Sequence, residues 1–174
     1  MESHAGETRL LAFLDGLGIA HKTYHHAPVF TVDEAQSARG EMPTGPEHRH
    51  SKNLFVRDKK KNYALVVAEE KAPIDLKALA DMIGLKRISF ASAERLEAYL
   101  GVKPGSVTPF AMLNAHERPA EDQPTIRVFI DQKLMAAERA YFHPLHNAAT
   151  TAIKPADLQV FLAACGVAAD VLTL

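Results

Sequence analysis

Apolar side chains near the start of the chain recur at steps of three and four residues. They follow Thr8 and are closed by Gly16 and Gly18, and their positions are Leu10, Leu11, Phe13, Leu14 and Leu17. This spacing predicts a short amphipathic helix. The segment 20–24 behind it predicts a short strand.

Thr31 and Glu34 have the three-residue spacing at which two side chains cap a helix N-terminus reciprocally. They predict a second helix that begins near Val32 and ends before Gly40. Residues 41–50 are rich in Pro, Gly and His and predict a mobile loop.

The clearest strand pattern is a hairpin. Residues 53–57 and 63–68 are apolar or β-branched, and the charged run 58–62 separates them. Two such segments around a short polar turn are typical of paired antiparallel strands.

Helical and extended patterns continue to alternate along the rest of the chain. We expect a helix over 75–83, ended by Gly84, and another over 93–100, capped by Ser92 and ended by Gly101. Further expected elements are strands at 87–90, 110–113, 125–130, 139–142 and 150–153, a surface loop at 114–124, a turn after 131, and a last helix from 155 or 156 to 164.

The order of these elements predicts the fold class. Strands and helices are interleaved without strict βαβ alternation, which favours an α+β fold with a mixed, mostly antiparallel sheet or barrel-like core and helices packed outside. A chain of 174 residues without a visible repeat or linker predicts one domain over residues 1–174.

Charge limits the class of partner. Twenty Lys and Arg residues face 21 Asp and Glu residues, for a formal net charge of -1, which excludes a wholly basic nucleic-acid coat protein. The segment 49–61 departs from this average because it holds six basic residues and one acid, Asp58. Its formal charge is +5, and the remainder of the chain carries -6.

The single cysteine, Cys165, sits among apolar neighbours, which predicts a buried structural thiol and a reducing, cytoplasmic setting. The first residues lack the basic-then-apolar order of a signal peptide. No run approaches the roughly 18 apolar residues of a membrane span, so we expect no membrane partner.

The basic segment has two interpretations. Its residues Arg49, Arg57, Lys59, Lys60 and Lys61 could face RNA phosphates, or they could form a solvated hairpin tip. Lys52 differs because it lies at the junction of the His-rich loop and an apolar strand, where an ammonium can point into a cleft. It could equally be a surface lysine. Asn53 beside it could supply an amide group to the same cleft, or it could simply begin the strand.

Two further segments could carry chemistry. In residues 101–109, two glycines and two prolines force a specific backbone path whose N–H groups could bind an anion or a carbonyl oxygen; a plain turn is the alternative. In residues 142–151, His143 could transfer a proton or donate a hydrogen bond, with Asn147 and Thr150 as neutral partners. A histidine buried as a structural hydrogen-bonding group fits the same pattern.

Metal and covalent chemistry are not indicated. Nine histidines occur, but no HExxH motif and no cysteine pair at zinc-finger spacing accompany them. No serine sits in a GxSxG elbow. We therefore expect neither a metal nor another cofactor.

Three separated motifs together resemble the YbaK/ProX family of aminoacyl-tRNA deacylases. They are SKNLFVRDKK from Ser51, GVKPGSVTPF from Gly101 and FHPLHNAAT from Phe142, and they occur in the family's order. The third motif resembles the ProX branch, which clears alanine from tRNA(Pro), more than the YbaK branch, which clears cysteine. The resemblance implies the editing-domain fold and no cofactor.

Carried over residue by residue, the resemblance implies that Lys52 and His143 are catalytic. It implies substrate contacts for Asn53, Asn147 and Thr150. The family's GxxxP substrate loop falls on Gly105, Ser106, Val107, Thr108 and Pro109.

The implied reaction is attack of water on the aminoacyl ester at the 3′ end of tRNA(Pro), aided by the ribose hydroxyl of the tRNA, with steric exclusion of proline. Apolar candidates for the pocket wall are Phe30, Val32, Ile130 and Phe142. Implied partners are the acceptor end of mischarged tRNA(Pro) and prolyl-tRNA synthetase. The alternatives are a non-catalytic tRNA- or synthetase-binding module, a deacylase of Cys-tRNA(Pro), and a small-molecule hydrolase.

Overall fold

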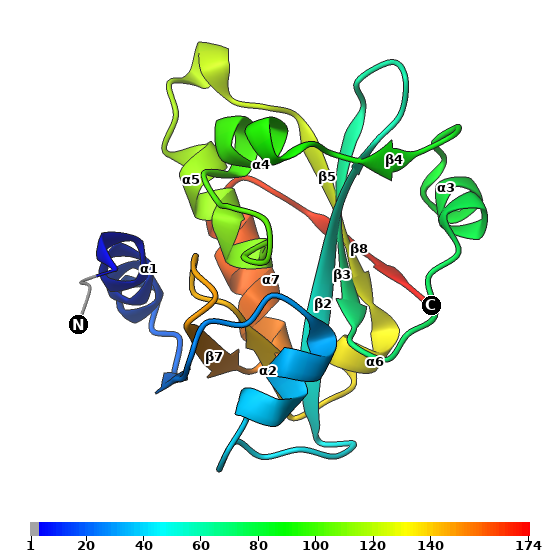
Figure 1. The fold of residues 1–174 in the computed structure, drawn as a ribbon. Helices are drawn as coiled ribbons and strands as arrows, with labels where there is room; N and C mark the ends of the chain where they lie inside the picture. Colours follow the sequence, from blue (N-terminus) through cyan, green and yellow to red (C-terminus); the bar gives the residue numbers. More distant parts are fainter. Residues whose placement is uncertain (1–3) are drawn as a thin grey trace.

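A mixed sheet forms the centre of the computed structural model, which describes residues 4–174 (Figure 1). Its strands are β1 (His21–His25), β2 (His48–Arg57), β3 (Tyr63–Glu69), β4 (Ser89–Phe90), β5 (Ile126–Asp131), β6 (Arg139–Phe142), β7 (Ala149–Ile153) and β8 (Ala169–Leu172). Its helices are α1 (Ala5–Gly16), α2 (Val32–Ala38), α3 (Leu76–Ile83), α4 (Ala93–Leu100), α5 (Met112–His116), α6 (Gln132–Met135) and α7 (Pro155–Ala164), with 3-10 turns at Pro109–Ala111 and Ala120–Asp122. Within this described part, no helix combines the length and the apolarity that a bilayer crossing needs.

The strand order is β1-β7-β6-β2-β3-β5-β8, with β4 on β2. Strand β2 is the junction of this sheet. Its first residues pair with β6 in parallel, from His48 opposite Arg139, and its later residues pair with β3 in antiparallel fashion, from Ser51 opposite Glu69. Four of the pairings are antiparallel and three are parallel over residues 4–174, so the expected mixed, mostly antiparallel sheet is confirmed.

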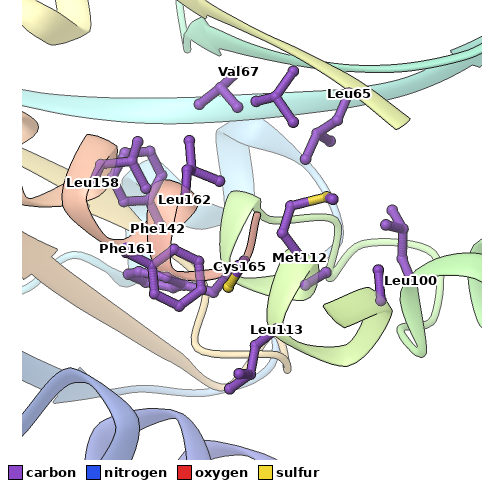
Figure 2. Packing of buried hydrophobic residues seen from close by; sticks show 14 of the residues in the cluster. Leu65, Val67, Leu100, Met112, Leu113, Phe142, Leu158, Phe161, Leu162 and Cys165 are labelled. Carbon is purple, nitrogen blue, oxygen red and sulfur yellow. The ribbon is translucent and has the colours of Figure 1, made fainter. Parts of the chain in front are cut away.

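The main core lies on one face of the sheet. Figure 2 shows Leu65 and Val67 of β3 directed toward Leu162 of α7 and Met112 of α5. Phe110 meets the ring of Phe161 edge to face, at 5.3 Å between centroids. Helices α1, α4, α5, α6 and α7 all contribute to this cluster, and its burial provides the dominant driving force for folding.

The opposite face is covered unevenly. Helix α3 packs Leu79 and Ile83 against Val56 and Val66, and Asp75 caps its start while Gly84 ends it in the left-handed conformation. Helix α2 buries none of its own residues. It therefore lies over the sheet without filling the space beneath it.

Most elements occur where the pattern predicts them, but the strand predicted at 110–113 is wrong. These residues form a 3-10 turn that continues into α5. A fully buried apolar run has no periodicity that separates strand from helix. Pro109 at the first position and the cap from Thr108 favour the helical turn.

Three further differences are smaller. Strand β2 begins at His48, so the expected loop 41–50 is shorter. Helix α6 occupies the expected turn after Asp131, and β8 is a strand that the sequence pattern does not predict. Cys165 is buried as expected. Burial, with a smaller contribution from Glu117, raises the pKa of its thiol to about 12.

Candidate functional site

A cavity of about 250 Å³ lies between α2, the middle of β2, and the loop 101–109. We call it the α2 cavity. Its lining residues are Val29, Phe30, Thr31, Val32, Ala35, Ser51, Lys52, Asn53, Gly105, Val107 and His143. The cavity thus brings together three residues that are separated by up to 91 positions in the sequence: Lys52, Asn53 and His143.

The α2 wall is fixed at its start by the predicted reciprocal cap. The Glu34 amide donates to Thr31 Oγ1 at 3.1 Å, and the Glu34 carboxylate accepts from the amides of Phe30 and Thr31. Asn147 Nδ2 donates to Val29 O at 2.8 Å, and the Val29 amide donates back to Asn147 O at 3.1 Å. Asn147 therefore fixes the segment that enters α2 and does not itself line the cavity.

Lys52 is half-buried in the cavity wall, and its Nζ donates to the carbonyl of Ala72, which follows β3. This bond fixes the position of the ammonium. An ammonium has three donors, so two stay available for an anion or a carbonyl oxygen.

Asn53 lies next in the wall and belongs to a short hydrogen-bonded chain. Its Nδ2 donates to Ser51 Oγ at 3.2 Å, and Ser51 Oγ donates to Tyr141 O at 2.9 Å. The buried Asn53 Oδ1 has no partner among the described residues. Because an unpaired buried acceptor is costly, this oxygen is ready to accept from a ligand.

His143 directly follows β6 and has a defined tautomer. Its Nδ1 lies 2.8 Å from Ala149 O, and a carbonyl only accepts, so the proton is on Nδ1. Burial lowers the pKa of His143, and nearby His26 and His146 lower it further, against the raising effect of the Ala149 bond. The ring is therefore neutral at pH 7, with Nε2 as an acceptor.

Only two residues of the loop 101–109 line the cavity. Gly105 has φ +86°, and a Cβ there would meet Phe30 Cδ1 at 3.3 Å. Gly105 and Val107 line the cavity, whereas Ser106, Thr108 and Pro109 are buried away from it. Their roles are local, since the Ser106 amide donates to Lys103 O and Thr108 Oγ1 accepts from the Phe110 amide.

A smaller space of about 40 Å³ continues behind the α2 cavity and contains groups that sequence reasoning missed. Arg39, at the end of α2, forms a buried ion pair with Glu70. His50 stacks on Tyr141, with ring centroids 4.2 Å apart. Thr150 lines the same space and bonds His26 Nε2 at 2.9 Å. The sequence contains one signal for this region, the acidic pair Glu69 and Glu70 at the end of the second hairpin strand.

Of the predicted wall residues, Phe30 and Val32 line the α2 cavity. Phe142 reaches only the smaller space behind it. Ile130 lies in the main core instead. Its position in an apolar strand is compatible with a pocket wall, but its side chain points to the face of the sheet that carries the main core.

The basic segment 49–61 does not form one patch. The exposed Lys59, Lys60 and Lys61 lie at the β2–β3 turn, at the opposite end of the strand from α2 (Figure 1). The five steps from Lys52 to Arg57 alone span about 17 Å. The Asp58 carboxylate accepts from the Asn62 amide at 2.9 Å and from its Nδ2 at 2.8 Å, which holds the turn.

The two arginines of the segment lie on either side of Lys52. Arg49 is 3.8 Å from Glu69 Oε1, and Arg57 Nη1 donates to Asp58 O at 3.4 Å. Both are half-buried.

The histidines are distributed over separate sites. His25 and His146 share the Glu7 carboxylate, and His48 bonds the Tyr141 hydroxyl. Within residues 4–174, no three His, Cys, Asp or Glu side chains are grouped so as to hold a metal ion.

A family model of the aminoacyl-tRNA editing domain matches residues 26–161, which include every residue that lines the α2 cavity. The chain belongs to this family. The match also contains the β2–β3 hairpin, the loop 101–109 and the segment around His143.

Two relatives agree with this assignment, and a solved structure shares the fold. Prolyl-tRNA editing protein ProX of Acetoanaerobium sticklandii is 35% identical over 158 residues, which cover 90% of each chain. Prolyl-tRNA synthetase associated domain-containing protein 1 of Mus musculus is 31% identical over 158 residues, which cover 88% of this chain and 87% of that protein. A solved structure of a candidate trans-editing enzyme for prolyl tRNA synthetase shares the fold, with a TM-score of 0.69, 20% identity and 98% of each chain covered.

The editing domain should lose stability in mild acid through His50. Burial, and then the charge of Arg39, lower its pKa to about 4, although the Pro43 carbonyl and Glu70 oppose this. The unfolded chain takes up this proton near pH 6.5, so stability falls as the pH drops from 6.5 to 4. We expect the neutral state of His50 to lower the free energy of unfolding by on the order of 3 kcal/mol over this pH range.

Urea unfolding of wild type and His50→Gln, each measured at pH 7 and pH 4.5, checks this expectation. The variant should lose less stability between the two pH values than the wild type. His116→Gln, at an exposed site, is the matched control and should behave as the wild type. If His50→Gln loses as much stability as the wild type between the two pH values, His50 is not the group responsible.

Proposed function

We propose that this protein is a trans-editing deacylase that hydrolyses the ester of mischarged tRNA, with Ala-tRNA(Pro) as its substrate. The observation that carries this is the α2 cavity, in which Lys52, Asn53 and the neutral His143 surround one small space in an editing-domain chain. The relative named for prolyl-tRNA editing supports the same conclusion.

The reaction needs only water and three polar groups. Water attacks the ester carbonyl carbon, the bond from that carbon to the ribose oxygen breaks, and the ribose oxygen takes a proton. The Lys52 ammonium faces the developing negative charge on the carbonyl oxygen or the terminal phosphate. His143 Nε2 accepts a hydrogen bond from the attacking water or from the ribose hydroxyl.

Asn53 has a distinct role in this mechanism. Its unpartnered Oδ1 accepts from the α-amino group of the esterified amino acid, which is the donor that every such substrate carries. Holding that end of the substrate fixes the ester relative to Lys52. Correct placement of a labile ester and a water can supply several kcal/mol of the acceleration.

Selection for alanine rests on the size of the cavity. Phe30, Val32 and Ala35 form its apolar side, and Gly105 lies close against Phe30. A pocket gains only about 1–3 kcal/mol per methylene when it prefers one side chain over another. Exclusion of the proline ring by the cavity wall is therefore the effective device, and cysteine, one sulfur larger than alanine, is the competitor to compare.

Amino-acid release from Ala-tRNA(Pro), Cys-tRNA(Pro) and Pro-tRNA(Pro) tests this function. We expect the fastest release from Ala-tRNA(Pro) and none above background from Pro-tRNA(Pro). Lys52→Ala should reduce the rate at least about 100-fold, because the ammonium in the cavity is removed. Lys77→Ala, on the surface of α3, is the matched control and should keep full activity.

Two further observations complete that experiment. Lys52→Met keeps the aliphatic stem and separates loss of charge from loss of packing, and thermal melts confirm that both variants fold. Full activity in folded Lys52→Ala would remove this lysine from the mechanism. No release from any of the three substrates would leave a non-catalytic RNA- or synthetase-binding module.

The pH dependence should report the neutral state of His143. Because burial lowers its pKa below 6.5, the acidic decline of wild-type kcat/KM should have its midpoint below pH 6.5. Below this midpoint kcat/KM should fall about tenfold per pH unit, because the ring takes up a proton. His143→Gln should have low activity without this acidic decline, whereas His116→Gln should keep it. The same decline in His143→Gln would assign it to another group.

The basic hairpin turn is a proposed contact for the body of the tRNA. Lys59, Lys60 and Lys61 are exposed and lie far along β2 from the α2 cavity, so they fit the acceptor stem better than the aminoacyl end. Arg57 lies beside this turn, and Arg49 lies on the other side of Lys52. A direct complex with prolyl-tRNA synthetase is part of the same proposal.

Charge reversal of the three turn lysines to Glu tests this contact. Affinity for uncharged tRNA(Pro) should fall, and the slope of log affinity against log salt should flatten by about 0.9 for each phosphate that the turn no longer binds. The kcat at saturating substrate should stay the same, since the turn does not reach the ester. An unchanged salt slope would show that the turn is only solvated.

A further inference from the structure

A second cavity, of about 280 Å³, lies at the β1 end of the sheet. It is bounded by β1, β7, β6 and the first residue of β2. Half of its lining residues are basic, and within the described chain none of them is acidic: His21, Lys22, His48, Arg139 and Lys154. The floor is Tyr24, Tyr141 and Ala152. We call this the basic cavity.

Strand register places most of these side chains on one face, whereas His21 is at the alternate position, next to Lys22 on β1. Lys22 pairs with Ala152, and Ala152 pairs with Tyr141, so the three lie in one row across β1, β7 and β6. Arg139 and His48 form the next row across β6 and β2. Side chains at alternate positions of a strand share a face, which adds Lys154 to the same side as Ala152.

The charges in this cavity are largely uncompensated. Over residues 4–174, Lys22, Arg139 and Lys154 form no ion pair with a carboxylate. Lys22 Nζ lies 4.8 Å from the centre of the Tyr24 ring, and Arg139 Nη1 donates to the Glu138 carbonyl at 2.9 Å. Only His21 has an acidic partner, Asp15, at 2.9 Å. Three cations around a cavity favour a ligand with more than one negative charge.

The basic cavity and the α2 cavity lie on the same face of the same strands. Lys52, His50 and His48 follow one another at alternate positions of β2. Arg139 and Tyr141 do the same on β6, and His143 is two residues further on. Two to four residues along a strand correspond to about 7–13 Å. A chain of phosphates that enters one cavity can therefore extend into the other.

We propose that the basic cavity binds backbone phosphates of the single-stranded RNA end, in the nucleotides that precede the esterified 3′ nucleotide. This site rests on the proposed function, because it takes the α2 cavity as the position of the ester. Lys22, Arg139 and Lys154 contact the phosphates, and His48, held by the Tyr141 hydroxyl at 3.0 Å, borders them on the β2 side. The site positions the RNA and takes no part in the chemistry.

The test compares two triple variants that change the charge equally. The cavity variant is Lys22→Glu, Arg139→Glu and Lys154→Glu; the control is Lys77→Glu, Lys86→Glu and Lys133→Glu, at exposed positions that line neither cavity. Binding of uncharged tRNA(Pro) is measured at several salt concentrations. The cavity variant should bind at least about tenfold more weakly than the control, with a salt slope flatter by about 2 units, as expected for three single-strand phosphates.

A second arm separates the RNA end from other sources of phosphate. Removal of the unpaired 3′ nucleotides from tRNA(Pro) should weaken binding by the wild type more than binding by the cavity variant, which keeps only the contacts of the α2 cavity to lose. If this truncation weakens both proteins equally, or if the two triple variants bind intact tRNA(Pro) alike, the proposal is overturned. Binding of inorganic phosphate at the cavity without any loss of RNA affinity in the cavity variant would overturn it as well.

Deacylation kinetics then connect this site to the proposed function. The cavity variant should raise KM for Ala-tRNA(Pro) and leave kcat within about twofold, because its charges do not touch the ester. Failure of the wild type to deacylate any substrate would overturn the proposed function alone. The binding comparison on uncharged RNA would still decide the phosphate site.

Discussion

The pairing of β2 with two different neighbours is the constraint on which the site depends. The first residues of this strand are held by β6 and the rest by β3, and the side chains alternate between two environments throughout. Phe55 enters the main core, whereas His50, Lys52 and Val56 face the other way. A slip of one residue would exchange the two faces of the strand, so the packing of Phe55 in the main core and of Val56 on the opposite face helps to fix the position of Lys52.

Helix α2 converts this sheet face into a cavity because it is attached at its ends and not along its length. Asn147 holds the segment before it through Val29, and Arg39 at its end pairs with Glu70. No residue of the helix is buried. Burial energy therefore contributes little to its position, and a few polar contacts near its two ends determine the width of the space below.

Much of this arrangement could be predicted from the sequence, because the relevant signals are local. The cap formed by Thr31 and Glu34, the β2–β3 hairpin and the glycine ends of α3 and α4 each depend on a few adjacent residues. The strand predicted at 110–113 failed because a buried run carries no periodicity. The roles of Arg39, Glu70 and His50 could not be predicted, since each depends on a partner far away along the chain. The basic segment is divided between the β2–β3 turn and the α2 cavity for the same reason. Strand geometry, and not proximity in the sequence, determines which charged side chains lie near one another.

The close approach of Gly105 to Phe30 limits how the cavity can change. A Cβ at this position would press on Phe30, on the segment that leads into α2. The loop 101–109 and the entrance to α2 are thus in direct contact across the cavity, and neither can move inward without displacing the other. The opening available to a side chain is a property of this pair of segments, so an altered amino-acid preference would require coordinated changes on both sides of the cavity.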